Sequence, residues 1–545
     1  MSGAGDASAG GPQVDAALAR LGSCGPHQLL TLSLLALVYA TNAVYNVNYV
    51  FAVEEVGYRC AAEECAAPAE PWRNGTSALQ AVPERQCRCA HPSTGRDHAC
   101  TRFIYDNPHS FVAEFSLACE EWKPPLVGTA HMLGNMLGLL LQGQISDRFG
   151  RKAAAVGAGG VGAALGLAKS WATSFWPYVA LEGLEAALGD AFSPIFMLSI
   201  EMVEKKRAVL YQMILLNCYT GGLVVLPFVA RAVPYWRTFL RLLYAPTLLI
   251  LTYSFFLDES IRWLFSKGKR EEAIKLIQKI ARRNNVEVDD ALLNKLEYDD
   301  EVTERQTSNR RLLLKTFRSK IMLQRFAVCT AWWFTITLIN YGMMISSVLI
   351  AGDKYLNFAL LMLMDVPANL LCWLALARCR RRLPLLLSFT LGGVFCILHS
   401  FLLSGGGGGE GAGVGYAWAG LALFMAFETL ATFSYNIVYT YTSELFPTYT
   451  RNSLHALCAA AGRLGALLAP QMPLLMTYWS GLPALIFGVT SLASGALTLL
   501  MPETAGTRLP DTIREAENIG KSSAVEQEEQ ELKASDSPGL AAGKA

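Results

Sequence analysis

The sequence has 545 residues, of which 52% are hydrophobic and only 17% are charged, with a formal net charge of +1. Soluble domains usually carry about 25% charged residues, so this composition argues against a soluble globular protein. The near-zero net charge gives no indication of a nucleic-acid partner, and none is expected.

Apolar segments of about 20 residues recur along the chain, which is the length that a helix needs to cross the ~30 Å hydrocarbon core of a bilayer. The pattern predicts an all-α membrane protein with about twelve transmembrane helices. The expected spans lie near residues 28–53, 125–146, 153–173, 176–200, 209–232, 236–257, 326–350, 355–378, 384–404, 416–442, 453–478 and 482–501.

These spans divide the chain into regions. The N-terminal stretch has no basic segment abutting an apolar core, so it is not interpreted as a cleaved signal peptide. An amphipathic helix is expected in the central linker, where Ala273, Ile277 and Ile280 follow a helical stripe. The expected regions are a cytoplasmic tail (1–27), a first six-helix bundle (28–257), cytoplasmic linker helices (258–320), a second six-helix bundle (321–505) and a disordered cytoplasmic tail (506–545).

The basic residues indicate the orientation in the membrane. "SDRFGRK", "EKKR", "RWLFSKGKR", "ARCRRR" and "PTYTR" all follow even-numbered helices, whereas most of the opposite loops carry almost no Lys or Arg. Basic loops stay on the cytoplasmic side. We therefore expect a multi-pass plasma-membrane protein with both termini in the cytoplasm.

The loop over residues 54–124 is expected outside the cell and has its own chemistry. Its "NGT" at Asn74 is an N-glycosylation sequon. An even set of cysteines in a small extracellular segment indicates three disulfides, and the sequence does not choose among the fifteen possible pairings. Free thiols or a metal cluster are the alternative, but the spacings match no zinc pattern and no metal is expected. The cysteines are Cys60, Cys65, Cys87, Cys89, Cys100 and Cys119.

Acidic and basic residues repeat at matched helix ends in the two halves. "SIEMVEKKRAVL" after the fourth helix corresponds to "TSELFPTYTRNSL" after the tenth, and "LDESIRWL" after the sixth corresponds to "MPETAGTRL" after the twelfth. "GQISDRFGRK" after the second has a degraded counterpart, "ARCRRR", after the eighth. Two halves with matched corners are typical of a transporter built from parallel repeats.

These corners suggest a gate made of charge pairs that form and break as the halves close and open. The alternative is a set of static, solvated residues that only fix the topology. The candidate gating residues are Gly143, Asp147, Arg148, Gly150, Arg151, Glu201, Arg207, Glu259, Arg262, Glu444, Arg451 and Glu503.

Several of these motifs carry a family resemblance. "GQISDRFGRK" resembles the loop signature of the major facilitator superfamily. The Cys-rich first loop, "FVAEFSLACEEW", "LDESIRWLFSKGKREEA", "INYGM", "MDVPANLLCW" and "YTSELFPTYTRN" resemble the organic cation, carnitine and organic anion transporters of the solute carrier 22 family, over about residues 20 to 510. The resemblance is strongest to the organic cation and carnitine branch, and it implies two six-helix pseudo-repeats that work by alternating access.

Charges inside the membrane are costly and are functional candidates by default. The resemblance places Arg463 where anion and carnitine transporters also have Arg, and Asp365 at an acidic position shared by cation and carnitine transporters. Arg463 could hold a substrate carboxylate through two hydrogen bonds, and Asp365 could attract an ammonium. The alternative is an Arg463–Asp365 ion pair that only joins two helices. Anion transporters often have a Lys where this chain has the neutral Asn369.

The fourth helix departs from the family, because "LEGLEAALGD" replaces a segment that commonly contains Arg. Its acids could favour cations or carry protons. Glu182 and Glu185 lie near one end, where they could simply face lipid headgroups, whereas Asp190 is deeper and is the preferred candidate. Glu428 is the remaining acid inside a predicted span.

Aromatic and amide side chains complete the predicted substrate site. Electron-rich rings around a cation contribute roughly 0.5–2 kcal/mol each, although Tyr and Trp also gather at membrane interfaces. The candidate substrate-binding residues are Asn46, Tyr49, Asp190, Tyr219, Trp333, Asn340, Tyr341, Asp365, Asn436 and Arg463.

Together these features predict a secondary-active or facilitative carrier of small organic cations or carnitine-like zwitterions. No catalytic constellation or Walker-type loop is present, so neither an enzyme nor a cofactor is expected, and Na⁺ or H⁺ is a possible coupling ion. An organic anion carrier is the first alternative. The second is a non-transporting receptor that binds partners through the Cys-rich loop.

Overall fold

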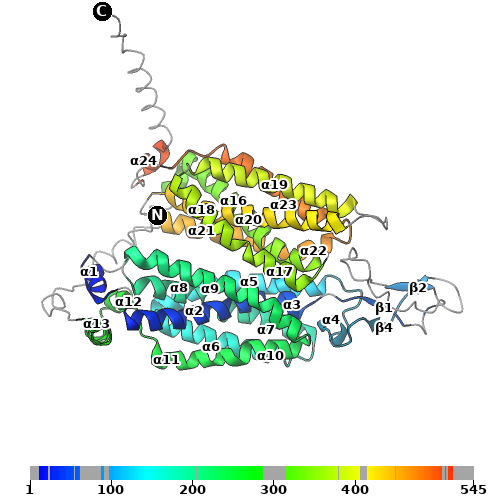
Figure 1. The fold of residues 1–545 in the computed structure, drawn as a ribbon, viewed down its shortest axis with the longest axis horizontal. Helices are drawn as coiled ribbons and strands as arrows, with labels where there is room; N and C mark the ends of the chain where they lie inside the picture. The colour runs from blue at the N-terminus through cyan, green and yellow to red at the C-terminus, as the bar shows by residue number, and fades with distance from the viewer. Residues whose placement is uncertain are drawn as a thin grey trace, which may run out of the picture.

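Two bundles of helices lie side by side, one from each half of the chain (Figure 1). This arrangement confirms the predicted all-α architecture with two helical halves. The computed structural model describes residues 12–22, 25–54, 56–61, 65, 87–90, 97–203, 205–286, 315–350, 352–378, 380–405, 414–447, 450–505, 510 and 513–519.

Among the described residues, each half contributes six long helical rods, some of them broken into shorter helices. The first half contains α2 (Pro26–Val47) with α3 (Tyr49–Ala52), α5 (Lys123–Phe149), α6 (Arg151–Lys169), α7 (Phe175–Leu188) with α8 (Phe192–Glu201), α9 (Lys205–Ala232), and α10 (Trp236–Thr247) with η1 (Leu248–Thr252) and α11 (Tyr253–Phe256). The second half contains α16 (Lys320–Ser346) with η2 (Ser347–Leu349), α17 (Lys354–Leu363) with α18 (Asp365–Arg378), α19 (Arg382–Gly405), α20 (Val414–Leu445), α21 (Arg451–Leu468) with η3 (Ala469–Gln471) and α22 (Met472–Leu475), and α23 (Leu482–Thr498).

Eight of the described helical stretches are long and apolar enough to cross a membrane, and α23 is a shorter apolar helix. The breaks in the rods have local causes. α10 contains Pro246, which cannot donate a helical hydrogen bond. Between α7 and α8, a Cβ on Gly189 would stand 2.5 Å from the Cα of Gly162, so a glycine is needed where α7 meets α6.

Polar contacts between the halves gather at the end of the molecule that carries Tyr58–Cys60 and residues 103–114, which we call the loop end. Gln471 donates to the Thr129 hydroxyl over 2.6 Å, and Arg231 pairs with Asp353 at 2.7 Å. The helix pairs that pack most extensively across the halves are α9 with α17 and α5 with α21 and η3. The opposite end, with Arg151 and its counterparts, is called the corner end.

The Cys-rich loop is held by short strands and three disulfides. β1 (Tyr58–Cys60) pairs antiparallel with β4 (Phe103–Tyr105), and β2 (Arg88–Ala90) pairs antiparallel with β3 (Asp97–Ala99). The helix α4 (Phe111–Glu114) then leads back to the bundle. The disulfides join Cys60 with Cys100, Cys65 with Cys89 and Cys87 with Cys119, which confirms the expected framework and selects one of the fifteen pairings. The predicted glycosylation site at Asn74 lies outside the described residues.

Short helices cover the corner end of the first half. α12 (Ile261–Ser266) and the amphipathic α13 (Arg270–Asn284) bury one face against α1 (Pro12–Leu21), which contributes Val14, Leu18 and Leu21. The predicted stripe on α13 is therefore covered by the N-terminal segment of the same chain.

The C-terminal tail differs from the expectation of a segment disordered throughout. Residues Ile513–Asn518 form the short helix α24, whose Ala516 is fully buried. Arg325 donates to the Ala516 carbonyl, and Ser319 donates to Glu517 over 2.5 Å. These bonds hold α24 against the start of α16.

Candidate functional site

Arg463 lies on α21, where the two glycines beside it bring that helix close to α16. A Cβ on Gly462 would stand 2.8 Å from the backbone of Trp333, and a Cβ on Gly465 would stand 2.3 Å from the Phe334 carbonyl oxygen. Such close approach of two membrane helices requires small residues at the contact. It sets the half-buried Arg463 beside Tyr341, whose hydroxyl accepts a hydrogen bond of 2.8 Å from the guanidinium.

The Arg463 guanidinium also interacts electrostatically with residues of three other helical rods. It interacts with Tyr435 of α20 and with Asp190, which lies between α7 and α8. Tyr219 of α9 interacts with Tyr341 and with the same guanidinium. The structure therefore brings together one cationic group, one carboxylate and three phenol rings from both halves.

Asp190 is held in place by neighbouring donors. The Asn42 amide nitrogen donates to its Oδ1 over 3.0 Å, and the backbone N–H of Phe192 donates to the same oxygen over 2.9 Å. These bonds fix the Asp190 carboxylate at the break between α7 and α8.

Asp365 does not pair with Arg463. Its Oδ1 accepts a hydrogen bond of 2.9 Å from the Thr432 hydroxyl, and the next turn of each helix joins Asn436 to Asn369 over 2.7 Å. The alternative of an Arg463–Asp365 ion pair is wrong for this arrangement, because the two side chains turn toward different helices. Asn436 thus joins Asp365 in a polar contact between α18 and α20, apart from Arg463.

Four other predicted residues make contacts within their own half of the molecule. Trp333 is buried, donates to the Thr442 hydroxyl over 3.3 Å and contacts the Tyr435 ring. The Asn340 amide donates to the carbonyl of its own helix at Ile336 over 2.7 Å. On the first helix, Asn46 bonds to Asn135 and Asn42, and the buried Tyr49 lies against Gly128 and the His131 ring.

A second charged cluster lies in the interior of the first half. Lys169 has no solvent exposure, and its Nζ lies 2.8 Å from Glu182 and 2.8 Å from Glu185. His131 contacts Glu182 at 2.9 Å, and the Tyr244 hydroxyl donates to Glu185 over 2.9 Å. The headgroup interpretation of the two glutamates is therefore wrong, because both are buried among α5, α6, α7 and α10.

Sequence reasoning missed Lys169 and His131 as parts of this cluster. Lys169 is the last residue of α6, a position where a lysine usually extends toward the membrane surface. The cluster could have been predicted because one apolar segment contains a lysine and the next contains two glutamates, and buried charges require partners.

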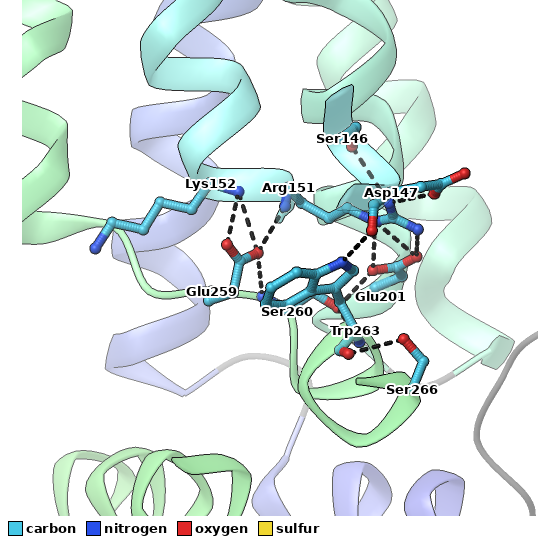
Figure 2. Close-up of polar contacts among 9 residues, drawn as sticks. All are labelled: Ser146, Asp147, Arg151, Lys152, Glu201, Glu259, Ser260, Trp263 and Ser266. Carbon is cyan, nitrogen blue, oxygen red and sulfur yellow. Dashed lines mark hydrogen bonds and ion pairs between the residues drawn. The ribbon is translucent and has the colours of Figure 1, made fainter. Parts of the chain in front are cut away.

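The corner of the first half ties the end of α5, the start of α6 and the end of α8 to the segment before α12 (Figure 2). Arg151 pairs with Asp147 at 2.6 Å and with Glu201 at 3.3 Å. Glu259 accepts from the backbone N–H groups of Arg151 and Lys152 over 2.9 and 3.1 Å. Burial raises the pKa of Glu259, and its backbone hydrogen bonds partly oppose the shift.

The glycine before this corner is a conformational requirement. Gly150 has φ of +108°, and a Cβ there would stand 2.3 Å from the Glu259 carboxylate. This part of backbone space is essentially restricted to glycine. Gly150 therefore allows α5 to turn into α6 while Glu259 caps the new helix.

The second half repeats the corner around Arg381, a residue that sequence reasoning did not name. Arg381 pairs with Glu444 at 3.4 Å, and its backbone N–H donates to Glu503 over 2.7 Å. Thr504 donates to Glu444 over 2.6 Å, as Ser260 donates to Glu201 over 2.5 Å in the first half. The recognisable signal was the degraded "ARCRRR" segment, in which Arg381 is the second of three consecutive arginines and directly precedes α19.

The other predicted gating residues surround these corners without joining the bonds just described. Arg148 is exposed and stacks on Phe149, Arg207 lies exposed at the start of α9, and a Cβ on Gly143 would meet open space. Arg262 and Arg451 are buried at helix starts. The ion pairs of Arg151 and of Arg381 each join elements of one half.

Comparisons with known proteins agree with this architecture. The family model "Sugar (and other) transporter" matches residues 106–514. The chain is 30% identical to organic cation/carnitine transporter 2 of Homo sapiens over 92% of this chain and 93% of the relative. It is 31% identical to solute carrier family 22 member 1 of Bos taurus over 76% of this chain and 72% of the relative.

Solved structures share the fold at low sequence identity. The partially occluded, inward-open xylose transporter XylE from E. coli is 14% identical and has a TM-score of 0.54, with 87% of this chain and 98% of that chain covered. A D-xylose-proton symporter structure is also 14% identical, with a TM-score of 0.55 and coverage of 89% and 99%. The match of the family model and the 30% identity to organic cation/carnitine transporter 2 over most of both chains show the family: the chain is a membrane transporter that belongs to the solute carrier 22 family of the major facilitator superfamily.

Proposed function

We propose that this transporter carries small organic cations and carnitine-like zwitterions. The observation that supports this most strongly is that Arg463 and Asp190, from opposite halves, interact electrostatically with each other. Tyr341, Tyr435 and Tyr219 interact with the same Arg463 guanidinium. A zwitterion places a carboxylate on the guanidinium and an ammonium near the carboxylate and the rings. The relatives named as organic cation/carnitine transporters support this substrate class.

The organic anion alternative has less support from the site. It is favoured by Arg463, but the position where a second cation would help is the neutral Asn369, which accepts a hydrogen bond from Asn436. Asp190 and Asp365 add negative charge around the space between the helices. An anion with no positive group would be repelled by these carboxylates.

Alternating access is the proposed mechanism. The polar contacts between the halves gather at the loop end, so this arrangement represents a state closed at that end. The proposed orientation places the loop end outside the cell and the corners in the cytoplasm of a plasma-membrane protein, as the distribution of basic residues indicates. Gating is assigned to the corners, which keep each half rigid while the halves change their contact.

The test is uptake of labelled carnitine and labelled tetraethylammonium by cells that express the full chain, with its surface level measured. We expect both to enter, and we expect the anion p-aminohippurate to be excluded. Uptake of p-aminohippurate alone would favour an anion carrier. Uptake of none of the three, with the protein at the surface, would favour the receptor alternative. Replacing external Na⁺ with K⁺ and varying external pH would identify the coupling ion.

A further inference from the structure

A line of polar residues on α20 faces α18 inside the second half. Glu428, Thr432 and Asn436 follow one another at one-turn intervals, opposite Asp365 and Asn369. Residues four apart in a helix share a face. The two helices therefore enclose two carboxyl groups with one hydroxyl between them.

The two carboxyl groups have too few hydrogen-bond donors around them for both to be ionised. Glu428 is 3% exposed, and its Oε2 has no hydrogen-bond partner. The Glu428 carboxyl interacts with Asp365 and with the Thr432 side chain, whose hydroxyl donates to Asp365 over 2.9 Å. A hydroxyl has one proton to donate, so Thr432 cannot also donate to Glu428.

No counter-cation reaches the pair within the described part of the chain. The nearest basic groups on the neighbouring elements have other partners: Arg463 of α21 bonds to Tyr341, and Lys354 of α17 bonds to Glu54. His399 of α19 packs against Phe424, one turn away from Glu428 on α20. Two adjacent carboxylates without a cation are strongly unfavourable in a low-dielectric interior.

We propose that Asp365 and Glu428 share one proton through Thr432 and exchange that proton for an organic cation. In the resting site, the Glu428 carboxyl group donates to the Thr432 oxygen, and the Thr432 hydroxyl donates to the Asp365 carboxylate. The Thr432 hydroxyl then both accepts and donates, and the site carries one negative charge. Asp365 is partly exposed whereas Glu428 is buried, so a ligand reaches the pair through Asp365.

The exchange conserves charge. When a tetraalkylammonium or primary ammonium binds beside the pair, the Glu428 O–H bond breaks and its proton passes to water. The two carboxylates then face one bound cation. This inference rests on the proposed transport of cations for its exchange step, whereas proton sharing itself is a property of the chain alone.

The first arm of the test measures thermal unfolding of the purified full chain without ligand. The folded chain holds the shared proton and the unfolded chain does not, so raising the pH from about 5 to about 8 favours the unfolded chain and the melting temperature should fall. Loss of that proton from the folded chain would leave two carboxylates in repulsion. Glu428→Gln keeps one carboxylate and cannot develop this repulsion. We expect its melting temperature to fall by at least about 3 °C less than that of the wild type over the same range. Asp365→Asn should show the same smaller fall in melting temperature, and it replaces Glu428→Gln in the comparison if that variant does not fold.

Glu272→Gln, on the exposed face of α13, is the matched control and should keep the wild-type pH dependence. Identical pH dependence in wild type, Glu428→Gln and Asp365→Asn would overturn proton sharing. A higher melting temperature in NaCl than in KCl at about pH 8, lost in Glu428→Gln, would also overturn it, because the site would then hold sodium.

The second arm counts protons during tetraethylammonium binding, by calorimetry in two buffers with different ionisation enthalpies. We expect the wild type to release up to about one proton per bound cation and Glu428→Gln to release none. Equal release by both proteins would overturn the exchange. Absence of tetraethylammonium binding would count against the proposed cation substrate, while the first arm would still decide whether the proton is shared.

Discussion

The Arg463 guanidinium donates a hydrogen bond of 2.8 Å to the Tyr341 hydroxyl, and this bond joins α21 to α16 beside the space between the halves. A tyrosine oxygen orients the guanidinium without neutralising it. Under the proposed function, this leaves the charge available for a substrate carboxylate, which an Arg463–Asp365 pair would have prevented.

Arg463→Ala should weaken carnitine uptake selectively. The loss of a charge-assisted hydrogen bond to a carboxylate is expected to cost about 1.5–3 kcal/mol, which corresponds to about a 10- to 150-fold rise in KM for carnitine. Tyr341→Phe removes only the orienting hydroxyl and should have a smaller effect. Tetraethylammonium uptake, which needs no guanidinium, is the comparison. Equal loss of both substrates in Arg463→Ala would show that the arginine is needed for structure.

Lys169→Ala should destabilise the protein strongly. The substitution leaves Glu182 and Glu185 buried without their ammonium partner, which is expected to cost about 3–5 kcal/mol of unfolding free energy. Thermal unfolding of the purified chain measures the effect. The triple variant Lys169→Met, Glu182→Gln, Glu185→Gln removes all three charges together. It should recover at least half of the unfolding free energy that Lys169→Ala loses. A triple variant as unstable as Lys169→Ala would argue against uncompensated charge as the cause.

Gly150→Ala should destabilise the corner of the first half by about 1–3 kcal/mol, because the backbone there has a positive φ and Glu259 occupies the space of a Cβ. Gly143→Ala, seven residues earlier on α5, is the matched control with open space around its Cβ. It should be neutral or stabilising by up to about 1 kcal/mol. Similar melting temperatures for the two variants would contradict the requirement for glycine at 150.

Glu259 should make stability depend on pH in a defined direction. Burial raises its pKa above the ordinary value of 4.5, so the folded protein binds more protons than the unfolded chain between those two values. Its contribution is then fully present below pH 4.5 and is lost as the pH rises through the folded-state pKa. Glu259→Gln does not titrate, so the melting temperature of the wild type minus that of Glu259→Gln should decrease as the pH rises through this window. A difference that increases with pH would show that the backbone N–H donors outweigh burial.

The sequence alone determined the order of the helical spans, the two halves and the position of the corner glutamates Glu201, Glu259, Glu444 and Glu503 at helix ends, but not their arginine partners. Apolar length and the repeated motifs around Glu201 and Glu444 are local signals, and a bilayer leaves few folds that satisfy them. The even cysteine count likewise indicated the disulfide framework. The apolar stripe on α13 indicated that this face of the helix would be covered.

Tertiary structure alone decided which side chains meet. The disulfide pairing, the burial of Lys169 between Glu182 and Glu185, and the separation of Arg463 from Asp365 all depend on how each helix is rotated about its axis. That rotation is set by close contacts such as Gly462 against Trp333. Hydrophobic periodicity cannot specify it here, because a helix surrounded by lipid and other helices is apolar on nearly every face.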